Sequence, residues 1–451
     1  MAADPTTIFA LASAPGRAGI AVVRVSGPGA GAALLALAPK MTALPAPRLA
    51  TRAVLYASES NMNDGCEKID DALVLWFPGP ASFTGEDVVE FHIHGGHAVL
   101  DSLITSLSAL DGLSPAGPGD FSRRAFEHGK MDLTAVEAIA DLVDAETAAQ
   151  RRQALAQMGG ALAKQYDGWR ERLVKSMAFA EASIDFAEED IPDDLARQSI
   201  AALRTLADEI DAHLADDGIG ERIRDGFRIA LTGAPNVGKS SLLNALAKRD
   251  VAIVSDIAGT TRDVIEVPLD LGGYAAVLID TAGLRDSDDA IEREGVRRAR
   301  DQAAQADLRL HLVDATAPAI TPLADTRTIL VANKADLLDR APAPTDGTVT
   351  ISVKTGAGIA DLIAEMSRRI KAQAETRAGA SAPLTRARHR TALEDCRDAL
   401  RRAIAAAEAG AAEEMMAEDM RIAAGALGRI TGRVDVEELL DRIFRDFCIG
   451  K

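Results

Sequence analysis

The stretch GAPNVGKS at residues 233–240 decides the fold of this chain. It follows the apolar, β-prone run 227–232, and leucines within 242–246 recur at helical spacing behind it. In such a loop the backbone N–H groups turn inward around phosphate oxygens, and the helix N-terminus adds partial positive charge. Lys239 would reach the β- and γ-phosphates, and the Ser240 hydroxyl would ligate Mg²⁺. The sequence therefore predicts a phosphate-binding loop between a strand and a helix.

Further motifs follow in the order and spacing of a GTPase: DTAG at 280–283, NKAD at 333–336 and SVK at 352–354. Asp280 would hold the Mg²⁺ shell while the Gly283 N–H approaches the γ-phosphate. The carboxylate of the NKAD motif would accept N1–H and the 2-amino group of guanine, which adenine does not offer as donors. The run GTTRD at 259–263 offers a threonine hydroxyl for Mg²⁺ in a loop that orders with the γ-phosphate.

Length, cysteine content and net charge limit the classes of protein to which this chain can belong. A length of 451 residues suggests about three domains, and no apolar run is long enough to span a bilayer. No secretory signal is visible at the N-terminus, and three widely spaced cysteines indicate free thiols in a reducing cytosol. The net charge of −18 argues against a protein that coats nucleic acid, but it allows RNA at a local basic patch.

Composition divides the chain into four segments. Residues 1–128 read as an α+β domain, 129–225 as helical, 226–374 as an α/β P-loop GTPase (Ras-like) unit, and 375–451 as helical again. The similar texture on both sides of the α/β unit indicates that this unit is inserted into one helical domain. Two separate helical domains are the alternative.

Periodicity and turn signals place the strands. The expected strands are 20–25, 53–57, 72–77 and 88–93 in the first domain, and 308–313, 328–331 and 349–353 in the α/β unit. The runs 263–271 and 274–279 flank a Gly-Gly turn and predict a hairpin at one sheet edge.

The catalytic machinery departs from that of signalling GTPases, because Leu284 stands where those enzymes carry a water-positioning glutamine. Two compensations are open. The side-chain carbonyl of Asn236 would help to bind a monovalent cation that does the electrostatic work of an arginine finger. Glu292 would orient water, although the residues alone favour an exposed helix carboxylate at that position.

The whole chain resembles the MnmE (TrmE) family, the tRNA-modifying GTPases that act on wobble uridine. The resemblance is carried by APGR at 14–17, SFTGED at 82–87, DIAGTTRD at 256–263, DTAGLR at 280–285 and the terminal CIGK at 448–451.

For the GTPase unit the resemblance implies K⁺ beside the nucleotide, which promotes pairing of two G domains. The K⁺ ligands would be Asn236, Ser255, Ile257 and Thr260, and the Mg²⁺ ligands Ser240 and Thr261. It also implies that Glu292 orients water, which reverses the preference from the residues alone. The implied GTP contacts are Asn236, Val237, Gly238, Lys239, Ser240, Ser241, Ser255, Asp256, Ile257, Ala258, Gly259, Thr260, Thr261, Asp280, Thr281, Ala282, Gly283, Asn333, Lys334, Asp336, Ser352, Val353 and Lys354.

For the first domain the resemblance implies constitutive homodimerisation and binding of a one-carbon tetrahydrofolate, 5,10-methylene-tetrahydrofolate or its 5-formyl analogue. The implied folate contacts are Arg24, Glu90, Lys130 and Lys451. The expected protein is a cytoplasmic homodimer, and an FAD-dependent MnmG-like partner would complete a heterotetramer with it. This assembly would add an aminomethyl-type or carboxymethylaminomethyl group to C5 of the wobble uridine. Two rivals are a switch or assembly GTPase, and a folate-dependent methyltransferase for which GTP is only regulatory.

Three further features have a plain and a functional interpretation. Cys448 in the terminal tail is either an inert thiol or a catalytic thiolate favoured by the adjacent Lys451. His92 and His94 share one strand face, but a structural or substrate-packing role is favoured over a metal site. The arginine-rich run 386–402 is by default a solvated helix face, with tRNA-phosphate contact as the hypothesis.

Overall fold

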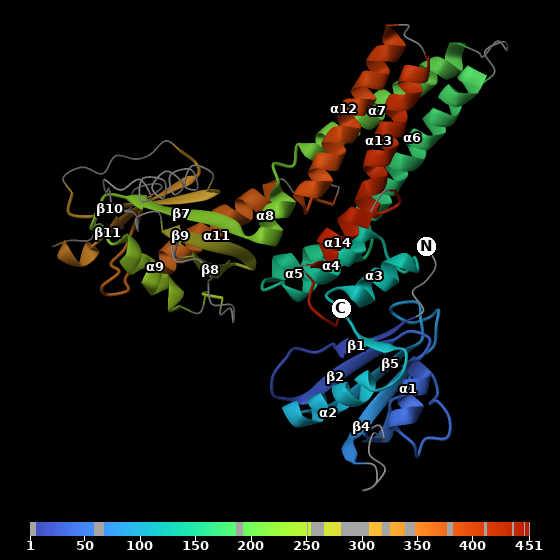
Figure 1. Cartoon of the computed structure of the whole chain (residues 1–451). Helices are drawn as coiled ribbons and strands as arrows, with labels where there is room; N and C mark the ends of the chain where they lie inside the picture. Colours follow the sequence, from blue (N-terminus) through green and yellow to red (C-terminus); the bar gives the residue numbers. More distant parts are fainter. Residues whose placement is uncertain are drawn as a thin grey trace, which may run out of the picture. The chain divides into compact units, whose positions relative to one another are not determined.

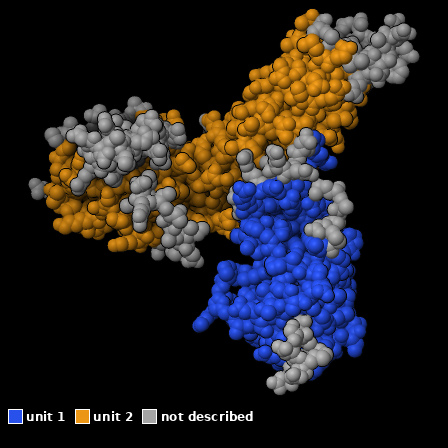
Figure 2. All heavy atoms as spheres, viewed as in Figure 1, with its two compact units in different colours: residues 1–140, 431–451 blue, residues 141–430 orange. Residues whose placement is uncertain are grey.

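The structure is a computed structural model that describes residues 6–57, 67–185, 193–249, 251–253, 266–280, 306–317, 325–338, 348–376, 382–409, 413–434, 437–445 and 447–450. Contacts divide the chain into two compact units, residues 1–140 with 431–451 and residues 141–430 (Figure 2). Within the described ranges no helix combines the length and the apolar character needed to cross a bilayer.

The first unit is built on a six-stranded sheet of order β3-β4-β5-β2-β1-β6 (Figure 1). Its strands are β1 (Thr7–Leu11), β2 (Ala18–Ser26), β3 (Thr51–Tyr56), β4 (Lys68–Phe77), β5 (Val88–Gly95) and β6 (Leu113–Pro115). Its helices include α1 (Ala30–Leu37), α2 (His97–Ser108), α3 (Asp120–Glu127) and α14 (Glu437–Arg445), while α4 (Leu133–Val143) runs across the division between the units. The four strands expected from the sequence are present, whereas β1 and β6 were not predicted.

Strand alternation separates two faces of this sheet. Val23 and Phe91 point into a core shared with α1 and α2. Arg24 and Glu90, one position along, lie on the opposite face, where Phe121 is fully buried against Ile8. This second face therefore carries Arg24 and Glu90, two of the residues predicted to contact folate.

The helical part of the second unit is a bundle with one core. Its long helices are α6 (Ala161–Asp185), α7 (Asp193–Leu214), α12 (Ala387–Glu408) and α13 (Glu413–Thr431). Tyr166 and Leu203, which precede the α/β part, are buried in the same cluster as Leu400 and Leu427, which follow it. Helices from both sides of the α/β part therefore share one core, whereas α14, at the end of the second helical segment, belongs to the first unit.

The inserted α/β part has a six-stranded sheet of order β12-β11-β10-β7-β9-β8. Its elements are β7 (Phe227–Gly233), α9 (Lys239–Ala247), β8 (Glu266–Leu271), β9 (Tyr274–Asp280), β10 (Leu308–Asp314), β11 (Thr328–Asn333), β12 (Thr348–Thr350) and α11 (Ile359–Thr376), with α5 (Ala148–Met158) and α8 (Ile219–Asp225) beside it. Among the described strands of this sheet, β8 is the one that runs antiparallel to its neighbour, β9, so the predicted edge hairpin is confirmed. The predicted strand 349–353 ends at Thr350, because the Ser352 N–H and carbonyl bond within the following turn to Ala357 and Gly356.

Candidate functional site

The loop between β7 and α9 is shaped by backbone conformations that favour glycine. Gly233 has φ +132° and Gly238 has φ +100°, and Asn236 between them also has a positive φ of +63°. A Cβ at Gly233 would lie 2.2 Å from the Leu312 carbonyl oxygen, and one at Gly238 would lie 2.3 Å from the Asn333 Nδ2. The loop is therefore pressed against the neighbouring strands β10 and β11, and side chains at these two positions are excluded.

Lys239 and Ser240 begin α9, and their side chains have different partners. Lys239 is buried, and its Nζ donates to the carbonyls of Gly233 and Ala234 at 2.7 and 2.8 Å. The Ser240 hydroxyl donates to Asp280 Oδ2 at 2.9 Å, across from the end of β9. A hydroxyl and a carboxylate side by side are hard oxygen donors of the kind that Mg²⁺ takes, so these residues fit that ion.

Asn333, the last residue of β11, is hydrogen-bonded both to the phosphate loop and to the loop that follows β12. Its Nδ2 donates to the Val237 carbonyl at 2.8 Å, and its Oδ1 accepts the Val353 N–H at 3.2 Å. The side chain is 3% exposed. The donor and the acceptor of this buried amide are both used. The amide therefore holds the base-side loops, which are the segments 333–336 and 352–354 expected to contact the guanine base, against the phosphate loop.

The carboxylate of Asp336 is held by the loop after β12. The buried Ser352 hydroxyl donates to Asp336 Oδ1 at 2.7 Å, and this hydrogen bond is the largest cause of a pKa below the usual aspartate range. Lys354 Nζ lies 4.0 Å from Oδ2 and is mostly exposed. The carboxylate is therefore ionised and oriented, as acceptance of two N–H donors requires.

Lys334 next to it was predicted from sequence, but its partner was not. Lys334 has φ +70°, and its Nζ donates to Asp314 Oδ2 at 2.7 Å. That bond, followed by bonds from Thr316, lowers the pKa of Asp314 to about 2. The available signal was the position of Asp314 at the carboxyl end of β10, where loops of a parallel sheet carry functional groups.

The remaining predicted residues of this site divide into two groups. Asn236 and Ser241 are exposed and Val237 is buried. Outside the described residues lie Ser255, Asp256, Ile257, Ala258, Gly259, Thr260, Thr261, Thr281, Ala282, Gly283 and Glu292.

A second candidate site lies on the polar face of the first unit's sheet. Arg24 and Glu90 are cross-strand neighbours, and the Arg24 Nε and Nη2 donate to Glu90 Oε1 at 3.0 and 2.9 Å. The Arg24 guanidinium lies 5.3 Å from the Phe83 ring centre and 5.7 Å from that of Phe121. His92 Nε2 is 3.4 Å from Glu90 Oε2. Polar groups that can accept and donate thus lie beside aromatic rings, a combination that fits a flat heteroaromatic ligand.

Lys130 is not part of that ion pair. Its Nζ donates to the Pro80 carbonyl at 2.8 Å, on the segment that contains the SFTGED motif. Behind this segment Arg124 Nη1 and Glu86 Oε2 are 2.9 Å apart with side chains only 9% and 10% exposed. Sequence reasoning missed this buried pair, which the Ser26 hydroxyl completes by donating to Glu86 at 2.8 Å. The pair fixes the segment whose Phe83 contacts Arg24.

The C-terminal tail adds a strand-like contact to the same unit. Ile449 forms an antiparallel bridge with Pro118, and a Cβ at Gly450 would lie 2.0 Å from the Leu11 carbonyl oxygen. The residue before Leu11 pairs with Arg24 across β1 and β2. Cys448 is exposed, and Lys451 lies outside the described residues.

The histidines and the arginine-rich run have partners inside the chain. His94 Nδ1 lies 2.8 Å from Asp70 Oδ1, and no metal-binding group of His, Cys, Asp and Glu occurs in the described ranges. Arg386 is paired with Asp141 at 2.6 Å and Arg390 with Asp216 at 2.7 Å. Arg388 donates to the Ile430 carbonyl at 3.2 Å. These three arginines, at the start of α12, are thus bonded to other parts of the chain, which disfavours the hypothesis that they meet tRNA phosphates.

Family models match both parts of the chain. The model described as MnmE helical domain matches residues 133–448, and the model described as GTP-binding protein TrmE N-terminus matches residues 7–130.

Curated relatives match the full length. A tRNA modification GTPase MnmE from Paramagnetospirillum magneticum is 56% identical over 99% of both chains. The proteins of that name from Rhodospirillum rubrum and Parvibaculum lavamentivorans are 54% and 53% identical, over 99% of this chain and 99% and 100% of theirs.

Solved structures match about a third of the chain. Aquifex aeolicus Era bound to GDP·AlF4⁻ is 26% identical, over 38% of this chain and 66% of its own, with a TM-score of 0.25. The G domain of the T. maritima FeoB iron transporter is 25% identical, over 33% of this chain and 99% of its own, with a TM-score of 0.23. The full-length relatives and the two family models decide the matter without these structures: the chain belongs to the MnmE family of tRNA modification GTPases.

Proposed function

We propose that this chain hydrolyses GTP and that hydrolysis serves the modification of the wobble uridine in certain tRNAs. The observation that carries the GTPase part is the convergence of Lys239, the Ser240–Asp280 pair and Asn333 at the carboxyl ends of parallel strands. Ligands of open α/β sheets bind at that edge. The family supplies the tRNA part.

In this proposal the nucleotide is held by residues with separate tasks. Lys239 exchanges its two backbone carbonyl partners for β- and γ-phosphate oxygens. Asp336, fixed by Ser352, accepts the two N–H donors of guanine. Ser240, Asp280 and Thr261 would hold Mg²⁺, which when bound neutralises charge on the phosphates.

The catalytic proposal rests on two features: Asn236 is exposed in the phosphate loop, and Leu284 replaces a glutamine after the DTAG motif. Asn236, Ser255, Ile257 and Thr260 would hold K⁺ beside the phosphates, with Glu292 orienting water. GTP hydrolysis by the full chain should therefore be much faster in KCl than in NaCl, and Asn236→Ala should remove the difference. Equal rates in the two salts for the wild type would overturn the K⁺ proposal.

The folate proposal rests on the Arg24–Glu90 pair beside Phe83 and Phe121. Glu90 would accept donors of the pterin ring and Arg24 would meet its carbonyl, while Lys130 and Lys451 would reach the glutamate tail. The bound 5,10-methylene-tetrahydrofolate would supply the carbon, and Cys448 is the candidate thiol beside it. Calorimetry with 5-formyl-tetrahydrofolate should give binding that Glu90→Gln weakens at least tenfold; equal heats would contradict the site.

The wider proposal is a cytoplasmic homodimer that works with a FAD-dependent MnmG-like partner as a heterotetramer. Hydrolysis would open and close the G domains rather than perform carbon chemistry. Mass spectrometry of wobble nucleosides from a deletion strain tests it, with the wild-type gene and the Asp280→Ala variant as complements. Unchanged nucleosides in the deletion would favour a switch or assembly GTPase, and full rescue by Asp280→Ala would favour a methyltransferase that GTP only regulates.

A further inference from the structure

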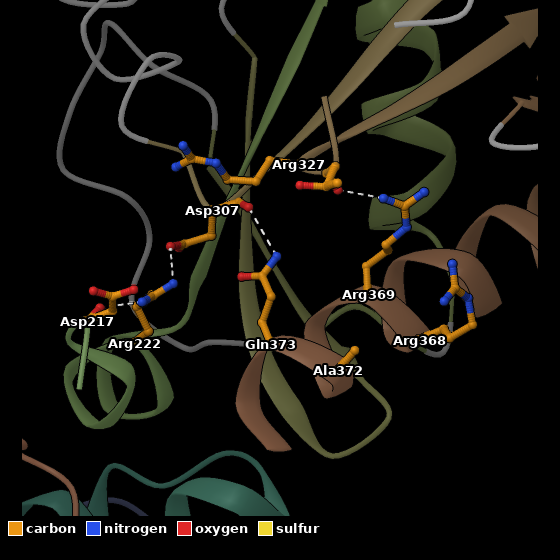
Figure 3. A pocket seen from close by; sticks show the side chains of 9 residues that line it. Asp217, Arg222, Asp307, Arg327, Arg368, Arg369, Ala372 and Gln373 are labelled. Atoms are coloured by element: carbon orange, nitrogen blue, oxygen red, sulfur yellow. Dashed lines mark hydrogen bonds and ion pairs between the residues drawn. The ribbon is translucent and has the colours of Figure 1, made fainter. Parts of the chain in front are cut away.

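An open pocket of about 910 Å³ lies on the α/β part, away from the residues considered so far (Figure 3). Its walls come from the start of α8, from the turns that precede β10 and β11, and from one face of α11. Four arginines and two aspartates line it, which is a local reversal in a chain of net charge −18. The family motifs include none of these residues.

The pocket and the nucleotide site occupy opposite ends of the same sheet. Asp307 precedes β10 and Arg327 precedes β11, whereas Asn333 is the last residue of β11 and the phosphate loop follows β7. β10 and β11 are parallel, and β10 has seven residues, so the two edges are about 23 Å apart at about 3.3 Å per residue. The pocket is therefore too distant to contact a nucleotide bound at the phosphate loop.

Three of the arginines are held in place by the chain itself. Arg222 Nη1 donates to Asp307 Oδ1 at 3.2 Å, and the same aspartate accepts the Arg228 N–H at 2.8 Å. Arg369 Nε donates to Glu365 at 2.8 Å, which also pairs with Arg368 at 2.6 Å. Their guanidinium groups are fixed at the wall, so little side-chain entropy is lost when an anion binds.

The fourth arginine has no such partner. Across the described ranges the Arg327 guanidinium makes no hydrogen bond or ion pair, and the residue is exposed. In Figure 3 its side chain lies beside Asp307, and the carbonyl of Thr326, the preceding residue of the same turn, accepts a hydrogen bond from Arg369 Nη1 at 2.5 Å. Asp307 is already paired with Arg222, and Asp325, whose carboxylate interacts electrostatically with Arg327, is paired with Arg309 at 2.6 Å. Arg327 is therefore the arginine of this pocket that has no ion pair of its own among the described residues. Planar guanidinium groups match phosphate oxygens in bidentate geometry.

We propose that this pocket binds phosphates of the tRNA backbone. An enclosed, mainly apolar cavity would suit a small ligand, whereas this one is open. Its arginines are spread over three elements, with Arg327 and Arg368 exposed and Arg222 and Arg369 half-buried. That arrangement suits a chain of phosphates. The arginine-rich run 386–402 is a poorer candidate, because its members Arg386, Arg388 and Arg390 are bonded to the bundle. The inference rests on the proposed function, which supplies the tRNA.

The test compares two charge-reversed forms of the full chain by fluorescence anisotropy with labelled tRNA over a range of KCl concentrations. Arg327→Glu with Arg368→Glu alters the pocket; Arg401→Glu with Arg421→Glu makes the same change of charge at exposed sites on α12 and α13. The pocket variant should bind at least tenfold more weakly near physiological salt. The slope of log K against log[salt] should fall by about 0.7–0.9 for each lost contact. GTP hydrolysis without tRNA should stay within twofold of the wild type.

The outcomes separate this inference from the function beneath it. Equal tRNA binding by the pocket variant and the wild type, or equal losses in both variants, would overturn the pocket alone. A wild type that does not bind tRNA would overturn both. Calorimetry with inorganic phosphate provides the small-anion arm: phosphate binding that only the pocket variant loses, with unchanged tRNA affinity, would also overturn the RNA assignment. If the double variant unfolds at a lower temperature, Arg327→Gln alone must still reduce the salt slope.

Discussion

Replacement of Gly238 by alanine tests whether the phosphate loop and the base-side loops form one packed unit. Gly238 has φ +100°, and an added Cβ would lie 2.3 Å from the Asn333 Nδ2. That nitrogen belongs to a side chain that is 3% exposed and donates to the Val237 carbonyl at 2.8 Å. The amide therefore has to move, and its hydrogen bonds have to break.

The cost follows from two terms. A side chain in the left-handed region costs about 1–2 kcal/mol, and a buried carbonyl left without its donor costs about 1–3 kcal/mol. The sum of about 2–5 kcal/mol falls on the conformation that binds nucleotide. At about 1.4 kcal/mol per factor of ten, guanine-nucleotide affinity should fall at least about 30-fold.

The assay is titration of the full chain with a fluorescent GDP analogue, together with thermal unfolding. Gly425→Ala on α13 is the matched control, because nothing lies within 4 Å of its added Cβ. Alanine within a helix is favoured over glycine by about 0.5–1 kcal/mol, so this variant should keep its affinity and become slightly more stable. A Gly238→Ala protein that binds GDP within threefold of the wild type would refute the packing argument.

Three further expectations concern single side chains. Asp336→Asn should lose GTP affinity at least tenfold in competition assays but gain xanthosine triphosphate, whose base has a carbonyl where guanine has an amine; unchanged selectivity would contradict the role of the carboxylate. Burial lowers the pKa of His213 from 6.5 to about 4, so the neutral ring is the folded form. The contribution of the neutral ring to the free energy of unfolding is complete above pH 6.5 and is lost as the pH falls from 6.5 towards 4, about 3 kcal/mol in all. In denaturant melts, the free energy of unfolding of His213→Gln should therefore depend less on pH between 6.5 and 4 than that of the wild type. Iodoacetamide followed by peptide mass mapping should label the exposed Cys448 in the native protein but Cys396 only after unfolding, because burial raises the pKa of Cys396 to about 12; native labelling of Cys396 would contradict this.

Local sequence was sufficient where one element determines the outcome. The phosphate loop was predictable because the residues from Gly233 to Lys239 determine the shape of the loop by themselves. The edge hairpin was predictable because Gly272 and Gly273 form its turn. The insertion was predictable because helical texture returns after the α/β unit, and Tyr166 and Leu400 do share a core.

Sequence was insufficient where the partner is distant. The Asp314 partner of Lys334 and the Glu86–Arg124 pair join residues 20 and 38 positions apart, and each looks like an ordinary surface charge. The same limit applies to Arg388, whose partners are the last carbonyls of α13. A charge run shows that cations are present, but only the fold shows whether they meet solvent or a helix end.

The chain passes between the bundle and the α/β part twice, and the two connecting segments are hydrogen-bonded to each other. A Cβ at Gly220 would lie 2.1 Å from the Leu384 carbonyl oxygen, and Arg224 Nη1 donates to the Thr385 carbonyl at 3.0 Å. Asp216 accepts the Leu384 N–H at 3.3 Å and pairs with an arginine of α12. The entering and leaving segments therefore cannot shift independently without loss of these bonds. A displacement of the α/β part would therefore act on both segments at once, as the proposed opening and closing of the G domains would require.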